Sequence, residues 1–452
     1  MTRVGVVGAG LSGRLLVLNL YRHARSDIEV IVVDRCDESA MGAAYSSDDD
    51  HLLLNVSAGQ LSAFDDDRDD FVAWARQQAA RADAHSFLPR RLYRQYVFER
   101  LRQARDARPE ALRLEQRRAE ATDVTVTSHG VVIRAGADQL SVDRVVLALG
   151  NFPPRQPPLH DAGVLESARY VGDPWRPGAL EAVAPNDSVV LIGTGQTATD
   201  LIVTLGERGH RGSIVAVSRH GLLPLAHVPL RAYPSFTAEL AGAERLIDLF
   251  RVVRRHLRRA TASGFDGRAV IDSLRPATQS IWLGLPDHDK RLFLRHLFRH
   301  WEIVRSRIPP RNAAVIAAMR ASGRLAIVAA RVVGLDDNGA HMTVDYRGHD
   351  GAVRRWRADV VVDCMGPEVD YERIDQPLVR NLLARGLVRP GPAGLGLDAL
   401  PDGTIIGRDG RPSLVLSTLG PPLRGVLWET IAVPEIRVQA RELARRLLQT
   451  GP

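Results

Sequence analysis

Short runs of apolar, largely β-branched residues recur along the chain, and two of them end in glycine-rich turns. The first is VGVVGAGLSG at residues 4–13, and the second is VVLIGTGQTATD at residues 189–200. Each run predicts a buried strand, and each turn opens a stretch whose apolar spacing predicts a helix. This order of elements indicates an α/β fold with two Rossmann-like units, each with three layers of the ββα type.

The pattern between and after the turns predicts how the two units are connected. Residues 144–158, RVVLALGNFPPRQPP, read as a strand that exits through Gly150 into a proline-rich linker. Residues 357–367, RADVVVDCMGP, repeat this form and exit through Gly366. Gly150 and Gly366 are both among the predicted cofactor-binding residues. We therefore expect the second unit to be inserted into the first. The expected domains are 1–158 with 357–452, and 165–356, the latter including a helical segment at 238–330.

The first turn carries a complete dinucleotide-binding fingerprint. Gly8, Gly10 and Gly13 have the GxGxxG spacing, and Asp34 ends the next predicted strand 21 residues after Gly13. Glycines let the backbone approach a pyrophosphate, the helix N-terminus supplies amide donors, and the acid binds an adenosine ribose. The predicted cofactor-binding residues here also include the neighbours Leu11, Ser12 and Arg35.

The second turn favours a different nucleotide. Ala198 replaces the third glycine, and the next strand ends in Ser218 and Arg219, where the first unit has an acid. A 2′-phosphate prefers a guanidinium and a hydroxyl to a carboxylate, so NADPH is favoured over NADH. The alternative is that Arg219 is a solvated arginine at a strand end. The predicted contacts are Gly193, Gly195, Gln196, Thr197, Ser218 and Arg219.

Composition narrows the class of protein. The 452 residues are 45% hydrophobic and carry a formal charge of +7, but Lys290 is the only lysine and the arginines are spread along the chain without interleaved aromatic residues. We therefore expect no nucleic-acid partner, although a basic helix face for docking stays open. No apolar run is long enough to span a membrane. The first turn follows closely on Met1, so the expected location is the cytoplasm.

Cysteine and histidine usage argues against two other chemistries. Cys36 and Cys364 form no CxxC pair, which disfavours a reductase with a local dithiol, and both are expected to be packed small residues. His296 and His300 are spaced for one helix face, with His288 nearby, but arginines surround them. We expect a structural or substrate-facing role for them and no metal site.

Several segments in a fixed order resemble a known family. They are GAGLSG, GAAYSSDDDHLLLNVSAGQLSAF, FLPRRLYRQYV, LALGNFPP, GDPWRP, SRHGLLP, LPDHDKRLFLRHLFRHWEIVRSRIPP and LGPPLRGVLWETIAVPEIRVQA. The chain resembles bacterial FAD/NAD(P)-binding proteins related to flavin-containing monooxygenases and to ornithine and lysine N-hydroxylases. The resemblance implies that the first nucleotide is FAD.

The resemblance also implies which residues face the flavin. Those are Asn55, Val56 and Ser57 in one segment, Arg91 and Tyr93 in a second, and Gly425, Trp428, Glu429 and Thr430 in the closing motif, where a helix is expected to begin beneath the isoalloxazine. The positive end of such a helix would stabilise negative charge on reduced flavin. For Trp428, ordinary core packing is an equal alternative.

Two enzyme classes follow from the resemblance. In the first, NADPH reduces FAD, and a C4a-hydroperoxide formed with molecular oxygen transfers oxygen to a small-molecule amine or sulfur nucleophile. In the second, the protein is an NADPH-dependent flavin dehydrogenase or reductase that passes electrons to an organic acceptor or a partner protein. The FxGxxxHxxxW segment of flavin-containing monooxygenases is missing, and only GDPWRP at residues 172–177 stands there. A non-enzymatic role for the nucleotides is a third possibility. No catalytic side chain, substrate or oligomeric state is predicted.

Overall fold

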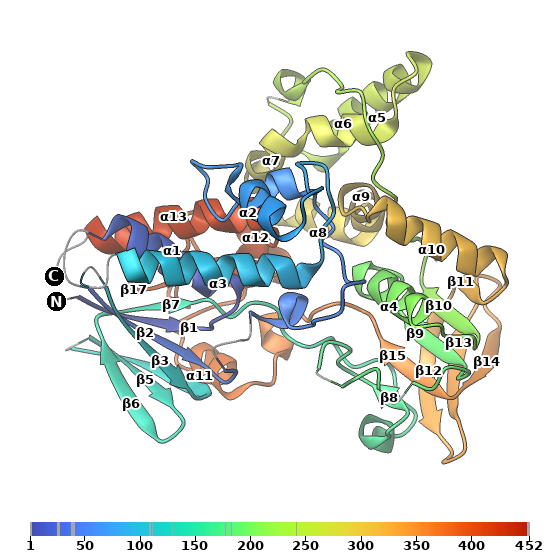
Figure 1. Cartoon of the computed structure of the whole chain (residues 1–452), viewed down its shortest axis with the longest axis horizontal. Coiled ribbons are helices and arrows are strands. Elements are labelled where there is room, and N and C mark those ends of the chain that lie inside the picture. Colours follow the sequence, from blue (N-terminus) through green and yellow to red (C-terminus); the bar gives the residue numbers. More distant parts are fainter. Residues whose placement is uncertain are drawn as a thin grey trace.

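The computed structural model describes residues 2–449 except 25–27, 38–40, 108–109, 111, 129, 177, 182 and 241. Its first unit is built on a sheet with the strand order β16-β17-β7-β1-β2-β3 (Figure 1). Apart from the antiparallel edge strand β16, neighbouring strands of this sheet run parallel. The strands are β1 (Thr2–Val7), β2 (Ile28–Asp34), β3 (Leu112–Arg118), β7 (Arg144–Leu147), β16 (Thr404–Ile406) and β17 (Pro412–Thr418).

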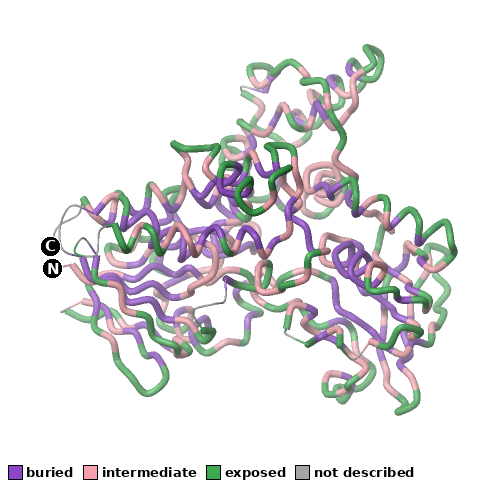
Figure 2. The backbone as a smooth tube through the Cα atoms, viewed as in Figure 1, coloured by how far each residue is buried: buried purple, intermediate pink, exposed green. Residues whose placement is uncertain are grey.

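Helices cover one face of this sheet and a second sheet covers the other. The helices are α1 (Leu11–His23), α3 (Arg90–Ala107) and α13 (Val433–Gln449), with α2 (Asp70–Gln78) packed beside them. The opposite face carries the antiparallel strands β4 (Ala121–Thr127), β5 (Gly130–Ala135) and β6 (Asp138–Val142), together with α11 (Pro377–Ala384). Strands β1 and β2 are buried along most of their length (Figure 2), because both faces of a covered parallel sheet exclude water.

The second unit repeats this plan. Its parallel sheet has the order β11-β10-β9-β15-β8, formed by β8 (Tyr170–Val171), β9 (Val189–Ile192), β10 (Ile214–Ser218), β11 (Leu325–Ala329) and β15 (Val360–Asp363). One face is covered by α4 (Gln196–Glu207) and α10 (Pro310–Ala321). The other is covered by the antiparallel strands β12 (Arg331–Asp337), β13 (Met342–Arg347) and β14 (Val353–Ala358).

A group of helices, here called the helical lobe, projects from the two units at the top of Figure 1. It consists of α5 (Leu246–Ala262), α6 (Gly267–Ser273), α7 (Thr278–Gly284), α8 (Asp287–His296) and α9 (Phe298–Arg305). The lobe shares a hydrophobic cluster with Leu395 and with Trp428, which directly follows α12 (Arg424–Leu427). Short 3₁₀ turns lie at Ala43–Tyr45, Ala58–Gln60, Ala162–Glu166, Thr237–Leu240, Arg275–Ala277, Tyr371–Arg373, Pro392–Gly394 and Pro421–Leu423.

Two boundaries differ from those expected from the sequence. The break at 356/357 falls inside β14, and β15, at 360–363, pairs with β9 and β8 in the second unit. The two strand-to-glycine exits look alike in sequence because each is the last strand of its own unit before the chain crosses over. The crossing segments then meet, with Pro154 bridged to Pro367. Residues 325–329, expected within the helical segment, form β11.

Candidate functional site

The first glycine turn has three glycines with three different surroundings. Gly8 has φ +109°, and a Cβ there would lie 2.3 Å from the carbonyl oxygen of Ala148. A Cβ on Gly13 would lie 2.1 Å from the carbonyl oxygen of Gly8. At Gly10 the nearest atom to such a Cβ would be the oxygen of Met41, 4.0 Å away. Gly8 and Gly13 therefore allow the turn and its packing on α1, whereas Gly10 faces open space at the helix N-terminus, where a pyrophosphate fits.

The carboxylate of Asp34 lies against this turn. It accepts hydrogen bonds from the backbone N–H groups of Ala9, at 2.6 Å, and Cys36, at 2.8 Å. Arg35 and Cys36 follow it and are exposed, so the expectation that Cys36 is a packed residue is wrong. The physical reason is that β2 ends at Asp34 and the chain leaves the sheet there. Leu11 and Ser12 begin α1, and Ser12 is buried.

The second glycine turn has the same backbone plan. Gly193 has φ +127°, and a Cβ there would lie 2.3 Å from the carbonyl oxygen of Cys364, which is buried as expected. At Gly195 such an atom would have only the Arg299 guanidinium nearby, at 3.8 Å. Gln196 and Thr197 begin α4, and the Gln196 amide donates to the carbonyl oxygen of Ser306 at 2.5 Å. Ser218 Oγ lies 2.8 Å from Thr194 Oγ1 inside the turn.

An arginine from the helical lobe, Arg299, completes the second turn. Its guanidinium donates to Thr194 Oγ1 at 3.1 Å and to the carbonyl oxygen of Leu222 at 2.9 Å. Arg219, the first residue after β10, has an exposed side chain. Sequence reasoning missed Arg299 because it lies on α9, about 100 residues after the turn, among many similar arginines.

Two histidines extend this basic cluster. The rings of His220 and His300 have centroids 6.1 Å apart. Burial lowers the pKa of His220, and the nearby positive charges of Arg219 and Arg299 lower it further. Two arginines and two imidazoles gather here, an environment suited to a phosphate group, and one of the arginines, Arg299, also pairs with Glu302 at 2.5 Å. His300 was expected to be structural or substrate-facing, and the helix that was to carry it with His296 is interrupted at Leu297.

The segment Asn55–Ser57 runs beside a histidine that the sequence did not single out. His227 Nε2 lies 2.9 Å from the carbonyl oxygen of Asn55, and the His227 ring packs on Phe87 with centroids 4.8 Å apart. Burial lowers the pKa of His227, which favours the neutral imidazole and a donated N–H. Val56 packs against the first core, and Ser57 precedes the 3₁₀ turn at Ala58–Gln60.

Arg91 and Tyr93 are adjacent in sequence but lie in different environments on α3. Arg91 forms an ion pair with Asp50 at 2.5 Å. Tyr93 is completely buried in a cluster of aromatic rings with Tyr45, Phe71 and Tyr96, and burial raises its pKa well above the ordinary value. Its position is that of a core residue.

The closing motif joins the first unit to the helical lobe. A Cβ on Gly425 would lie 2.2 Å from the carbonyl oxygen of Leu395, so only glycine fits there. Trp428 has φ +64° and is 7% exposed, stacked on Trp282 of the lobe with ring centroids 4.6 Å apart. Glu429 accepts two hydrogen bonds from Arg305, both at 2.8 Å. The hydroxyl of Thr430 is buried without a partner among the described residues.

Two further features concern the helix of this motif and the two exit glycines. Helix α13 begins at Val433, within the closing motif at residues 419–440, as expected. The exit glycines Gly150 (φ +68°) and Gly366 (φ +84°) have no atom within 4 Å of where a Cβ would stand. Both therefore border open space, as required where a bulky cofactor approaches the backbone.

A buried ion pair connects the two units. Arg90, at the start of α3, donates to Asp200 on α4 at 2.6 Å and to the carbonyl oxygen of Leu53 at 3.1 Å. Burial raises the pKa of the Asp200 carboxyl, and the guanidinium opposes that shift. The indole of Trp175, from the GDPWRP segment, lies over Arg90 at 5.5 Å. This segment therefore takes part in the contact between the units.

Neither a metal centre nor a membrane-spanning helix is present among the described residues. They contain no group of three or more His, Cys, Asp or Glu side chains arranged to hold a metal ion. None of the helices in the described part of the chain has the length and apolar character needed to cross a membrane.

Comparison with known proteins places the fold. Residues 5–152 match a family described as FAD-NAD(P)-binding. No curated protein matches the chain by sequence. An ornithine N-hydroxylase of Kutzneria sp. 744, with reduced FAD, NADP⁺ and L-ornithine, aligns with a TM-score of 0.67 and 14% identity over 99% of this chain and 98% of its own.

Two further solved structures are similar over the whole length. L-lysine 6-monooxygenase from Pseudomonas syringae has a TM-score of 0.66 and 14% identity over 99% of both chains. Bacillithiol disulfide reductase from Staphylococcus aureus has a TM-score of 0.57 and 12% identity, again over 99% of both. The expected fold class is confirmed: the chain has the fold of flavoproteins with two dinucleotide-binding units, and its N-terminal third is a FAD-NAD(P)-binding region.

Proposed function

We propose that the protein is a FAD-dependent, NADPH-using oxidoreductase, and specifically a monooxygenase that acts on a small-molecule amine or sulfur nucleophile. The observation that carries the proposal is the contrast between its two glycine turns. The first presents the carboxylate of Asp34, and the second presents Ser218 with Arg219 and Arg299. A carboxylate suits a ribose and the guanidinium groups suit a 2′-phosphate, so the turns fit FAD and NADPH respectively.

The residues present fit both cofactors. Gly10 and Gly195 leave the space that a pyrophosphate needs at the start of α1 and α4. Gly150 and Gly366 border open space at the two crossings between the units. When bound, FAD would accept a hydride from NADPH and react with dioxygen. The protein supplies binding, orientation and the exclusion of water.

Water exclusion is the task that the helical lobe can perform. Its Arg305 pairs with Glu429, its Gln279 donates to the Glu429 carbonyl oxygen at 2.8 Å, and its Trp282 donates to the Gly425 carbonyl oxygen at 2.8 Å. These contacts hold the lobe against the closing motif. A monooxygenase requires such a cover, because water and protons near the flavin divert the reaction to hydrogen peroxide. The similarity to two N-hydroxylating enzymes supports this interpretation.

The overall reaction balances as NADPH, H⁺, O₂ and substrate giving NADP⁺, water and the oxygenated substrate. The alternative, an NADPH-dependent flavin dehydrogenase or reductase, is favoured by one observation. Where flavin-containing monooxygenases carry FxGxxxHxxxW, this chain has only GDPWRP at residues 172–177.

The test separates reduction from oxygen transfer. Flavin-loaded protein is mixed with NADPH or NADH without oxygen, and loss of the visible flavin absorption is followed; oxygen and candidate amines or sulfides are then added. We expect NADPH to reduce the flavin faster than NADH does. We also expect an oxygenated product to form in place of part of the hydrogen peroxide. Flavin that NADPH does not reduce contradicts the proposal. Reduction with a peroxide yield that no amine or sulfide changes supports the reductase instead.

A further inference from the structure

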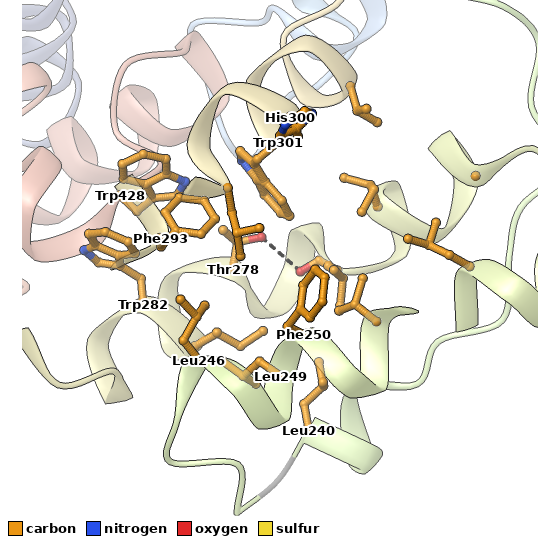
Figure 3. Close-up of a pocket in the computed structure, with 18 of the residues that line it drawn as sticks. Leu240, Leu246, Leu249, Phe250, Thr278, Trp282, Phe293, His300, Trp301 and Trp428 are labelled. Carbon is orange, nitrogen blue, oxygen red and sulfur yellow. Dashed lines mark hydrogen bonds between the residues drawn. The ribbon is translucent and has the colours of Figure 1, made fainter. Parts of the chain in front are cut away.

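A cavity of about 630 Å³ lies inside the helical lobe (Figure 3). Its walls come from α5, α6, α7, α8 and α9, with Trp428 entering from the first unit. Leu246, Leu249 and Phe250 of α5 lie on one side, and Trp282, Trp301 and Trp428 lie on the other. This volume lies within the range of small-molecule binding sites.

The threonine hydroxyl, the carboxylate and the guanidinium in the cavity wall all have partners within the protein. Thr278 Oγ1 donates to the carbonyl oxygen of Leu274 at 3.1 Å, the dashed line of Figure 3. Asp266 and Arg268 pair with each other at 2.9 and 2.5 Å, and hydrogen bonding to Arg268 lowers the Asp266 pKa to about 2. The wall therefore offers a ligand apolar surface and no unpaired carboxylate.

The cavity also borders the closing motif and lies next to an arginine that contacts the second glycine turn. Trp428 in its wall follows α12, where Gly425 accepts a hydrogen bond from Trp282. His300 in the wall is next to Arg299, which donates to Thr194 of the second turn. A molecule in this cavity would therefore contact Trp428 of the closing motif and His300, the neighbour of Arg299.

Ring contacts hold Trp428, in the cavity wall, in a strained backbone conformation. Trp428 has φ +64° and ψ −67°, a conformation that is unfavourable for a residue with a side chain. Stacking on Trp282 and edge contacts with Phe293 and Phe298 fix its indole at the cavity wall. Strain of this kind is concentrated at ligand-binding positions.

We propose that this cavity binds the hydrocarbon body of a lipophilic substrate, a long-chain or aryl-substituted amine or sulfide, rather than a charged amino acid. That the occupant is a substrate rests on the function proposed above. The class of occupant rests on the wall itself: transfer of a hydrocarbon chain into an apolar cavity is favourable, whereas an unpaired carboxylate and ammonium would lose hydration without gaining a partner.

Binding is measured by calorimetry on the flavin-loaded protein without NADPH, with n-butylamine, n-hexylamine, n-octylamine and L-lysine as probes. Each added methylene group is expected to lower Kd roughly three- to fourfold, so octylamine binds on the order of a hundredfold more tightly than butylamine. Lysine is expected to bind more weakly than octylamine. Intrinsic fluorescence is a second readout, because three of the six tryptophans line the cavity.

Two variants on α5 separate the cavity from the lobe surface. Phe250 lines the cavity and is 39% exposed, whereas Ile247 is 50% exposed and lies outside the lining. Phe250→Gln is expected to weaken octylamine binding about tenfold, and Ile247→Gln to change it less than twofold. Both sites reach solvent, so both variants are expected to fold, which circular dichroism verifies.

The proposal is overturned if Kd does not depend on chain length, if lysine binds as tightly as octylamine, or if the two variants lose binding equally. Anaerobic reduction by NADPH is measured on the same preparations. If binding depends on chain length but NADPH does not reduce the flavin, the cavity proposal is supported and the proposed function is refuted. Normal reduction without chain-length dependence refutes the cavity.

Discussion

The two glycine turns are close copies in backbone geometry. Gly8 and Gly193 both have positive φ. A Cβ on either would lie 2.3 Å from a backbone carbonyl oxygen, that of Ala148 after β7 or that of Cys364 after β15. Each also donates its N–H to the strand that follows the helix, Gly8 to Val33 and Gly193 to Val217. The same steric problem, a sharp exit from a central strand, has the same solution in both units.

The side chains around the turns differ. Asp34 binds a backbone N–H of the first turn, whereas Ser218 contacts the side chain of Thr194 in the second. At the second turn, Arg299 donates to the side chain of Thr194 and also pairs with Glu302 at 2.5 Å. Backbone geometry therefore provides a place for a pyrophosphate, and the strand-end side chains determine which nucleotide enters.

The largest expected effect comes from filling the open position of each turn. Gly10→Val places a branched side chain where the pyrophosphate of FAD would approach, so the purified protein should lose its yellow colour. Gly195→Val should keep the flavin and lose its reduction by NADPH. Flavin absorption and anaerobic reduction measure the two effects.

The clash distances provide the control for these substitutions. Gly10 and Gly195 have space for a side chain, whereas Gly13 does not, because its Cβ would lie 2.1 Å from a backbone oxygen. Gly13→Val should therefore reduce folding itself, seen as loss of soluble protein. A stably flavinated Gly10→Val variant would contradict the assignment of the first turn.

The sequence predicted the repeated backbone plan but not the contacts between distant segments. Both fingerprints, the inserted unit and the helical segment follow from local spacing. The location of β15 could not be predicted, because residues 144–150 and 360–366 have the same form and only pairing shows which sheet holds each. Arg299 and His227 were missed because loops and helices of another part of the chain carry them to the site. The cavity depends on helix packing, which one sequence does not reveal.

The next largest effect tests the connection between the two units. Arg90 and Asp200 pair at 2.6 Å in a buried environment between α3 and α4. Arg90→Met would leave Asp200 buried without a partner, which is expected to cost about 3–5 kcal/mol of folding free energy. Chemical denaturation measures this cost. The double variant with Asp200→Leu should recover part of the loss, and a double variant no better than the single one would mean that Asp200 is not the cause.

A smaller effect tests nucleotide choice at the second turn. Arg219→Ala and Arg299→Ala each remove a guanidinium from the basic cluster, and each charge-assisted contact is worth about 1.5–3 kcal/mol. Each should weaken NADPH use by roughly ten- to a hundredfold and leave NADH almost unchanged. Rates of anaerobic flavin reduction with the two nucleotides measure this. Arg211→Ala, on the loop before β10, provides a matched control, and equal losses with both nucleotides would indicate a structural role.

The smallest effect concerns a position at which the two crossing strands differ. Leu147 pairs with Val7 in the first sheet, and the corresponding partner of Ile192 in the second is Asp363. Asp363 is 1% exposed, and burial raises its pKa to about 7. The folded state therefore keeps this proton up to about pH 7, whereas the unfolded chain releases it near pH 4. The contribution of the neutral carboxyl to the free energy of unfolding is fully present below pH 4. It is lost as the pH rises towards 7.

Asp363→Asn removes this titration and keeps the shape of the side chain. The amide oxygen can accept the hydrogen bond of the Met365 N–H, at 2.8 Å from Asp363, and the amide N–H₂ can donate to the Tyr170 hydroxyl. At pH 8 we expect the variant to be more stable than the parent by about 1–3 kcal/mol, because the parent holds a buried charge that the amide lacks. At pH 4 the difference should disappear. Thermal melts across this range provide the measurement, and a difference that is constant with pH would show that the buried carboxyl of Asp363 is not the titrating group.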